Sequence, residues 1–87
     1  PQLSRWVANK EEHAKKIQNI VADYFLTQRV KPVSPGNEEA RTLYLEKIET
    51  LHQILVAAMK TRQGTNLDDL ESLRKLLDRF KRAYEKP

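Results

Sequence analysis

The chain has 87 residues, of which 39% are hydrophobic and 32% charged, and it contains no cysteine. This length suits a single small domain over residues 1–87, and the composition is typical of a charge-rich globular protein. Without cysteine, these residues can form no disulfide framework, no thiolate metal site and no cysteine nucleophile. The longest uninterrupted apolar run is Ile54–Met59, which is too short to cross a bilayer. We therefore predict no membrane span.

The net charge is +4, from 16 Lys and Arg against 12 Asp and Glu. A basic balance is compatible with nucleic acid, an acidic protein surface or an anionic membrane as partner. The charges are interspersed along the chain, however, and this pattern is more typical of solvated faces than of a nucleic-acid site. Because the chain begins with Pro1 rather than methionine, we expect a domain of a larger protein. We also expect an intracellular location, without distinguishing cytoplasm from nucleus.

Two interruptions divide the chain into three segments. Pro32, Pro35 and Gly36 fall within five residues, and proline removes a backbone donor and biases its predecessor away from helix. Further along, Gly64 stands where a helix stops, and Asn66 where the next one starts. The segments that remain span roughly residues 4–29, 36–62 and 67–85.

Each segment carries apolar residues at the three- and four-residue spacing of an amphipathic helix. The stripes are Val7, Ala14, Ile17, Val21 and Tyr24 in the first, Tyr44, Ile48, Leu51, Leu55 and Ala58 in the second, and Leu70, Leu73, Leu77, Phe80 and Tyr84 in the third. Three such helices can bury their stripes only against one another. The sequence therefore predicts an all-α protein, an antiparallel up-down-up three-helix bundle.

Polar residues at the segment ends predict the helix caps. Ser4 is a candidate for the first helix. The second helix has two alternatives, Ser34 followed by Pro35, or Asn37 followed by acidic residues. Asn66 with Asp69 resembles a capping box for the third.

The search for a catalytic or metal site finds little. His13 and His52 fall in different segments, and neither has a second metal-type residue at helical spacing on an inward face. The serines have no histidine nearby in sequence, and two glycines cannot form a phosphate-binding loop. We therefore predict that the chain is not an enzyme, has no catalytic residues and binds neither metal nor cofactor.

The second helix has the widest apolar arc, and this width has two interpretations. One is full burial between two neighbours. The other is a groove that accepts an amphipathic or acidic peptide segment of a partner protein. Leu43 and Ile54 flank the stripe on one side, and Leu45, Val56 and Met59 on the other. The partner-binding set is completed by Trp6 as an aromatic anchor and by Lys15 and Lys16 as a basic surface.

The stretch Glu39–Ile48 resembles the second helix of MIT domains, in which an Ala-x-x-x-Tyr pattern, here Ala40 and Tyr44, packs at a helix crossing. The stripe of Leu70–Tyr84 is compatible with the last helix of such modules. The resemblance implies a peptide-binding adaptor without chemistry of its own, and it does not assign the chain to a family.

Two alternatives remain open beside the adaptor. The basic residues in and just after the first helix could contact the phosphates of a nucleic acid, and they are Lys10, Lys15, Lys16, Arg29 and Lys31. The surplus face of the second helix could instead be buried in a homodimer.

Overall fold

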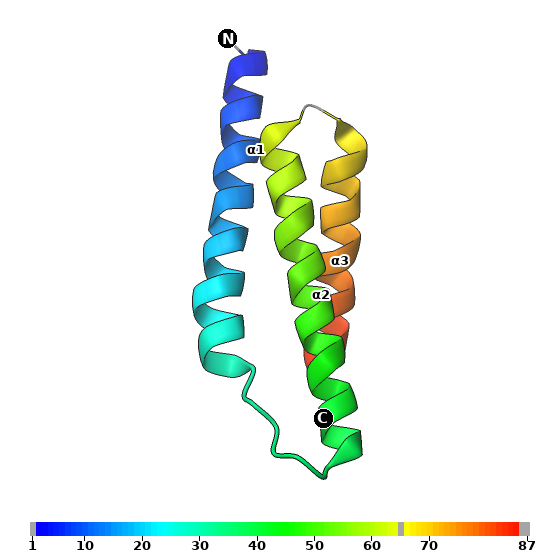
Figure 1. The fold of residues 1–87 in the computed structure, drawn as a ribbon. Helices are drawn as coiled ribbons and strands as arrows, with labels where there is room; N and C mark the ends of the chain where they lie inside the picture. Colours follow the sequence, from blue (N-terminus) through cyan, green and yellow to red (C-terminus); the bar gives the residue numbers. More distant parts are fainter. Residues whose placement is uncertain (1, 65, 86–87) are drawn as a thin grey trace.

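The computed structural model describes residues 2–64 and 66–85, with the side chains of residues 2–4, 6, 7 and 85 outside the described part. Its elements are α1 (Gln2–Asn19), the π-helix η1 (Ile20–Arg29) that continues it, α2 (Glu38–Gln63) and α3 (Leu67–Glu85). No strand occurs in the part of the chain that is described. The three rods run down, up and down (Figure 1), which confirms the predicted all-α antiparallel bundle.

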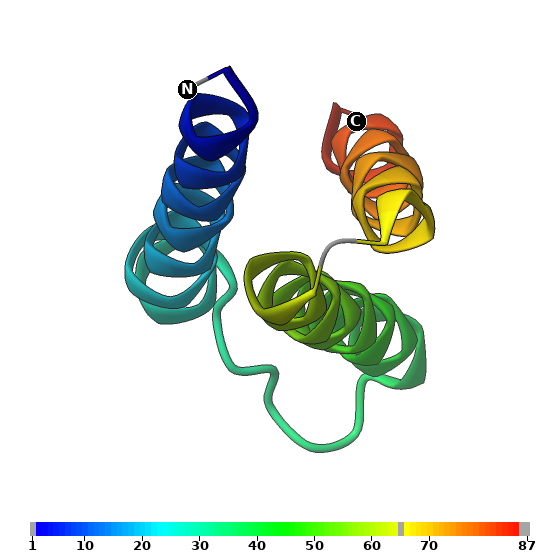
Figure 2. The ribbon, with the colours of Figure 1, turned by 90° about the horizontal axis from the view of Figure 1, so that it is seen from above.

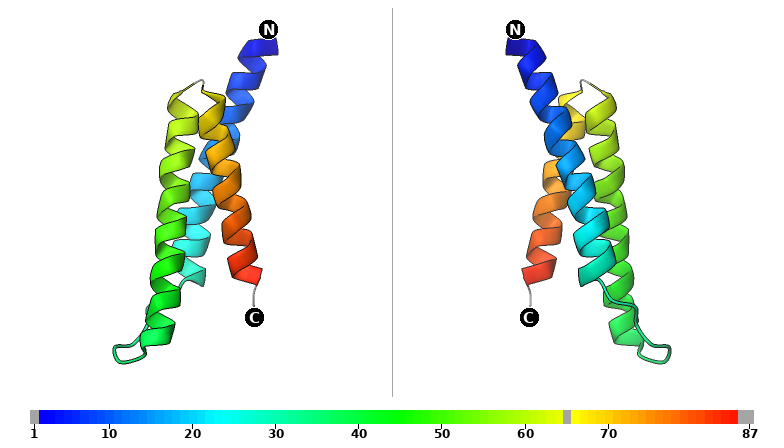
Figure 3. Two further views of the ribbon diagram at one scale, coloured as in Figure 1. Left: turned by 90° about the vertical axis from the view of Figure 1, so that its right-hand side faces the viewer. Right: turned by 90° about the vertical axis from the view of Figure 1, so that its left-hand side faces the viewer.

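The middle helix α2 holds the bundle together. Both α1 and α3 pack along it, whereas the backbones of α1 and α3 do not come close to one another within the described residues. Figure 2 shows α1 and α3 on either side of a gap, with α2 lying along one side of that gap. The molecule is elongated, at 56 × 21 × 20 Å, and the first turns of α1 extend beyond the other helices (Figure 3).

The core lies where α2 faces its two neighbours. Leu51, Ile54 and Ala58 of α2 are fully buried. Ala14 of α1 and Leu73 of α3 approach them from the two sides and are almost completely covered. These positions belong to the predicted stripes, with the exception of Ile54, which flanks the stripe of α2. Contact with two neighbours explains why the apolar arc of α2 is the widest.

The caps of α2 and α3 agree with the chemistry of their sequences. The side chain of Asn37 accepts a hydrogen bond of 3.1 Å from the backbone N–H of Ala40, which decides between the two predicted starts of α2. The side chain of Asn66 accepts one of 2.8 Å from the N–H of Asp68. Ser4, by contrast, lies inside α1, which begins at Gln2, so its predicted role as N-cap is wrong.

The last ten residues of the first rod wind as a π-helix rather than the predicted α-helix. Its wider register is visible where the N–H of Val30 donates to the carbonyl of Phe25, five residues earlier, at 2.8 Å. Val21 and Val30 are both buried, although nine residues at about 100° each would place them on opposite sides of an α-helix. Because more residues fill each turn of a π-helix, the wider winding brings both valines to the core.

An aromatic cluster joins η1 to the end of α3. The ring of Phe25 meets Phe80 edge-on at 5.0 Å and Tyr84 at 5.4 Å between centroids. Arg29 closes the cluster, since its Nε donates to the Tyr84 hydroxyl at 2.9 Å and its guanidinium lies 5.9 Å from the Tyr24 ring centroid. The bond to Tyr84 raises the pKa of Arg29 above its already high ordinary value, and the guanidinium is a cation in this contact.

Gly36 supplies the one positive φ among the described residues, at 99°. It follows Pro35 in the turn before α2, and Pro-Gly at these positions is typical of a type II turn. A Cβ here would meet no atom within 4 Å, so a substitution acts through backbone conformation alone. We expect Gly36→Ala to lower the free energy of unfolding by about 1–2 kcal/mol.

Gly36→Asn is the matched control, because asparagine tolerates positive φ better than alanine does. Its loss of stability in urea unfolding should therefore be the smaller of the two. Equal losses for both variants would show that the turn does not depend on this conformation.

Candidate functional site

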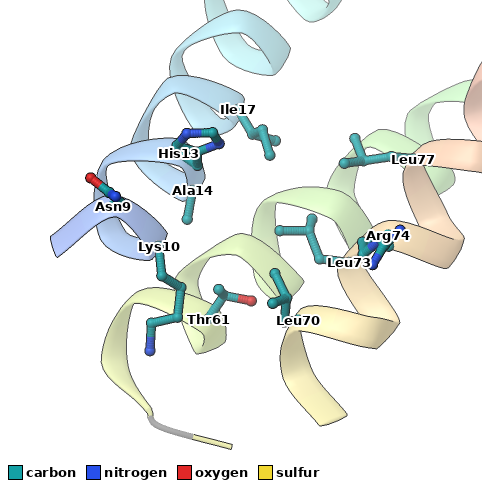
Figure 4. Close-up of a pocket in the computed structure, with 10 residues that line it drawn as sticks. All are labelled: Asn9, Lys10, His13, Ala14, Ile17, Thr61, Leu70, Leu73, Arg74 and Leu77. Atoms are coloured by element: carbon teal, nitrogen blue, oxygen red, sulfur yellow. The ribbon is translucent and has the colours of Figure 1, made fainter. Parts of the chain in front are cut away.

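A mainly apolar hollow lies in the gap between α1 and α3, and we refer to it as the α1–α3 groove. Its volume is about 310 Å³. Ala14 and Ile17 of α1 face Leu73 and Leu77 of α3 across it, and the close-up shows these side chains directed into the gap (Figure 4). The remaining lining residues are Asn9, Lys10, His13, Thr61, Leu70 and Arg74. The groove forms because the stripes of α1 and α3 face each other without close approach of their backbones.

The polar residues of the α1–α3 groove carry positive charge and no negative charge. Lys10 and Arg74 are cationic, Asn9 and Thr61 are neutral, and no Asp or Glu is among the described residues that line the groove. Lys10 is buried, and its Nζ donates to the carbonyl of Gly64 at the end of α2. A cation is favourable there because the last carbonyls of a helix carry partial negative charge. The lysine thus ties α1 to the end of α2.

Removing this tie has a predictable effect on stability. Lys10→Met keeps the apolar stem and loses the charged donor, and we expect the free energy of unfolding to fall by about 1.5–3 kcal/mol. The matched control is Lys15→Met on the exposed side of α1, which should change it by less than about 0.5 kcal/mol. Urea unfolding followed by circular dichroism measures both, and similar small losses would contradict the structural role of Lys10.

The predicted partner-binding residues of α2 do not form one surface. Ile54 is fully buried, which corrects its place in the predicted partner-binding set, whereas Leu43 and Leu45 are 54% and 48% exposed. These two leucines are two positions apart, so they point to nearly opposite sides of the helix. Val56 lines a hollow shared with α3, and Met59 lines another beside Glu11. Because α2 contacts both neighbours, its flanks are separated rather than joined into a groove.

The other predicted binding residues lie on α1. Lys15 and Lys16 are exposed, and the side chain of Trp6 lies outside the described part. Lys10 and Arg29, proposed for nucleic acid, are instead engaged with Gly64 and Tyr84. The sequence reasoning missed the α1–α3 groove, although Ala14, Ile17, Leu73 and Leu77 were all in the predicted stripes. These residues line a groove because α1 and α3 are separated. The spacing of apolar residues along one helix does not indicate the separation between two helices.

Metal-type side chains are scattered in the structure. His13 lines the α1–α3 groove, whereas His52 lines the hollow between α2 and α3 that also includes Asp69. Among the described residues, no three His, Cys, Asp or Glu side chains are grouped so that they could hold a metal ion. None of the described helices has the length and apolar character required to cross a membrane.

Comparison with known proteins identifies an enzyme family. The family model described as nickel-containing superoxide dismutase matches residues 1–87. No curated protein and no solved structure shows a significant match. The match overturns the predictions of a non-catalytic adaptor and of a chain that is not an enzyme, together with the adaptor function implied by the likeness to MIT domains. A homodimer stays a prediction. The chain belongs to the nickel-containing superoxide dismutase family.

Proposed function

We propose that this chain forms the helical body of a superoxide dismutase, an enzyme that converts two superoxide anions and two protons into dioxygen and hydrogen peroxide. The observation that carries the proposal is the family match from the first residue to the last. The charge of the chain supports it, since a net charge of +4 favours the approach of a small anion.

The residues of this chain do not fit a nickel centre of their own. Ni(II) bound by nitrogen and oxygen donors favours square-planar or tetragonal geometry, which needs several donors in one plane. The described residues offer no group of even three such side chains, and the sequence has no cysteine to supply a thiolate. We therefore assign no catalytic role to His13 or His52. The contribution that we propose for the chain is a folded support with a basic surface.

The test is superoxide consumption by the native protein that contains this chain. After treatment with a chelator, portions are reloaded with nickel, manganese, iron, copper or zinc, and the decay of superoxide is followed by pulse radiolysis. After unbound ions are removed by gel filtration, we expect decay to accelerate with the nickel-loaded portion and not with the others. Absence of nickel-dependent activity in the native protein would contradict the proposed function.

Two variants connect the activity to the bundle. Leu51→Ala removes a fully buried side chain, whereas Leu45→Ala truncates the same residue type where it is 48% exposed on the same helix. If the bundle supports the active enzyme, Leu51→Ala should lose activity at a lower temperature than the native protein, and Leu45→Ala should not.

A further inference from the structure

We infer that the three-helix bundle folds without nickel and holds none of its ligands, so that in the working enzyme the metal is bound by residues outside these 87 or by another chain. This inference rests on the proposed function, since it concerns where the metal of that enzyme resides. It follows from the disagreement between the family description and the donors of this sequence. Three features of the structure carry it.

The surroundings of His13 are unsuited to a dication. It lines the α1–α3 groove with the cationic residues Lys10 and Arg74, and the described lining includes no carboxylate. Positive side chains oppose the entry of Ni²⁺, and the apolar floor formed by Ala14, Ile17, Leu73 and Leu77 supplies no donor. His13 is therefore a lone imidazole in a basic groove.

The surroundings of His52 offer one additional metal-type side chain. The hollow that it lines includes one carboxylate, Asp69, and the cationic Lys60. A histidine and a carboxylate leave at least two positions of a tetragonal site without a protein donor. The two histidines also line different hollows of the bundle, so neither completes the other's donor set.

The interior of the bundle is complete without a metal. In the described part of the chain, every buried side-chain nitrogen or oxygen has a hydrogen-bond partner. The ligands of a structural metal site are polar, unprotonated side-chain atoms. If such a site were buried in the bundle, some of these atoms would lack a hydrogen-bond partner when the ion is absent. The buried polar side chains are Lys10, which contacts Gly64, and Thr61, whose hydroxyl donates to the carbonyl of Ala57 at 2.9 Å. Neither is arranged toward an ion.

The test uses the 87-residue chain and nickel sulfate. After removal of metals with a chelator, we expect a helical circular dichroism spectrum and cooperative thermal unfolding. We also expect a Tm that added nickel leaves unchanged within about a degree, and less than a tenth of an equivalent of nickel bound after dialysis. A one-to-one site with free nickel at about 100 times its Kd would raise the Tm of a domain this size by roughly 10–20 °C. Such a rise, one equivalent of retained nickel, or an unfolded apo chain would each overturn the inference.

A built site provides the positive control. Glu12 and Lys16 are exposed and one turn apart on α1, so the double variant Glu12→His, Lys16→His creates the i, i+4 pair that binds transition metals. Its Tm should rise with nickel while that of the parent does not. If the parent itself retains nickel, His13→Gln and His52→Gln identify the responsible residue, and the inference is wrong. This outcome is separate from failure of the proposed function, which is read from superoxide decay in the native protein.

Discussion

Leu51→Ala should lower the free energy of unfolding by about 2–5 kcal/mol. Leu51 is 0% exposed and lies at the centre of α2, the helix against which both α1 and α3 pack. Truncation removes contacts and leaves a cavity that the neighbouring helices cannot fully close. Since small domains have about 5–15 kcal/mol of total stability, the variant should be substantially unfolded at moderate temperature. Urea unfolding followed by circular dichroism measures the loss.

Substitutions of two other leucines serve as comparisons for the stability loss of Leu51→Ala. Leu45→Ala on the exposed side of α2 should change stability by less than about 0.5 kcal/mol. Leu77→Ala should fall between the two variants, because Leu77 lines the open α1–α3 groove and is only half-buried. If all three variants melt together, the burial pattern described for the bundle is wrong.

Phe80→Ala is expected to be the most damaging substitution at the aromatic end of the bundle, with a loss of about 3–5 kcal/mol. Phe80 is buried, meets Phe25 edge-on at 5.0 Å and stacks with Tyr84 at 5.7 Å. Its removal takes away two of the ring contacts at this end of the bundle and leaves Phe25 against Tyr84 as the ring contact described between η1 and α3. Thermal unfolding of the purified variant measures the effect.

Phe80→Leu is the matched control, since it retains apolar volume while losing the ring geometry. Edge-on and stacked pairs contribute about 0.5–1.5 kcal/mol beyond buried area, so this variant should lose clearly less stability than Phe80→Ala. Equal losses in the two variants would mean that ring volume does not matter at this site. Tyr84→Phe keeps the ring and removes only the acceptor for Arg29, and its Tm should stay close to that of the parent.

The helices could be predicted from the sequence because their local signals agree with one another. Apolar spacing around Leu51 and Leu73, the Pro-Gly turn at Gly36 and the asparagine caps all indicate the same three segments. Each of these signals depends on residues within a few positions of one another. That is why the fold class follows from one sequence without further information.

The π-helix and the Lys10 contact could not be predicted in this way. The π winding of η1 accompanies the burial of both Val21 and Val30, and the apolar spacing of this segment predicts an ordinary α-helix instead. Lys10 contacts Gly64, 54 residues away, and nothing distinguishes it in sequence from the exposed Lys15 and Lys16. Both features are consequences of tertiary packing.

The function was predicted wrongly for a related reason. An active site can be predicted from one sequence when metal-ligating or nucleophilic residues are clustered. In this chain the two histidines are far apart and there is no cysteine. The wide apolar arc of the second helix then suggested a surface for a partner. A helical body whose metal ligands lie elsewhere carries no motif for the reaction, so only the family relationship over the whole chain shows the enzyme class.

The central position of α2 also bears on how the chain acquires its structure. Every pair of rods with closely approaching backbones is consecutive in the chain, since α2 contacts the segment before it and the segment after it. Contacts between consecutive elements close short loops and cost little chain entropy. Helical proteins with such local topology fold in roughly microseconds to milliseconds. Either helical hairpin can form first on α2, and the remaining helix then docks onto a surface that already exists.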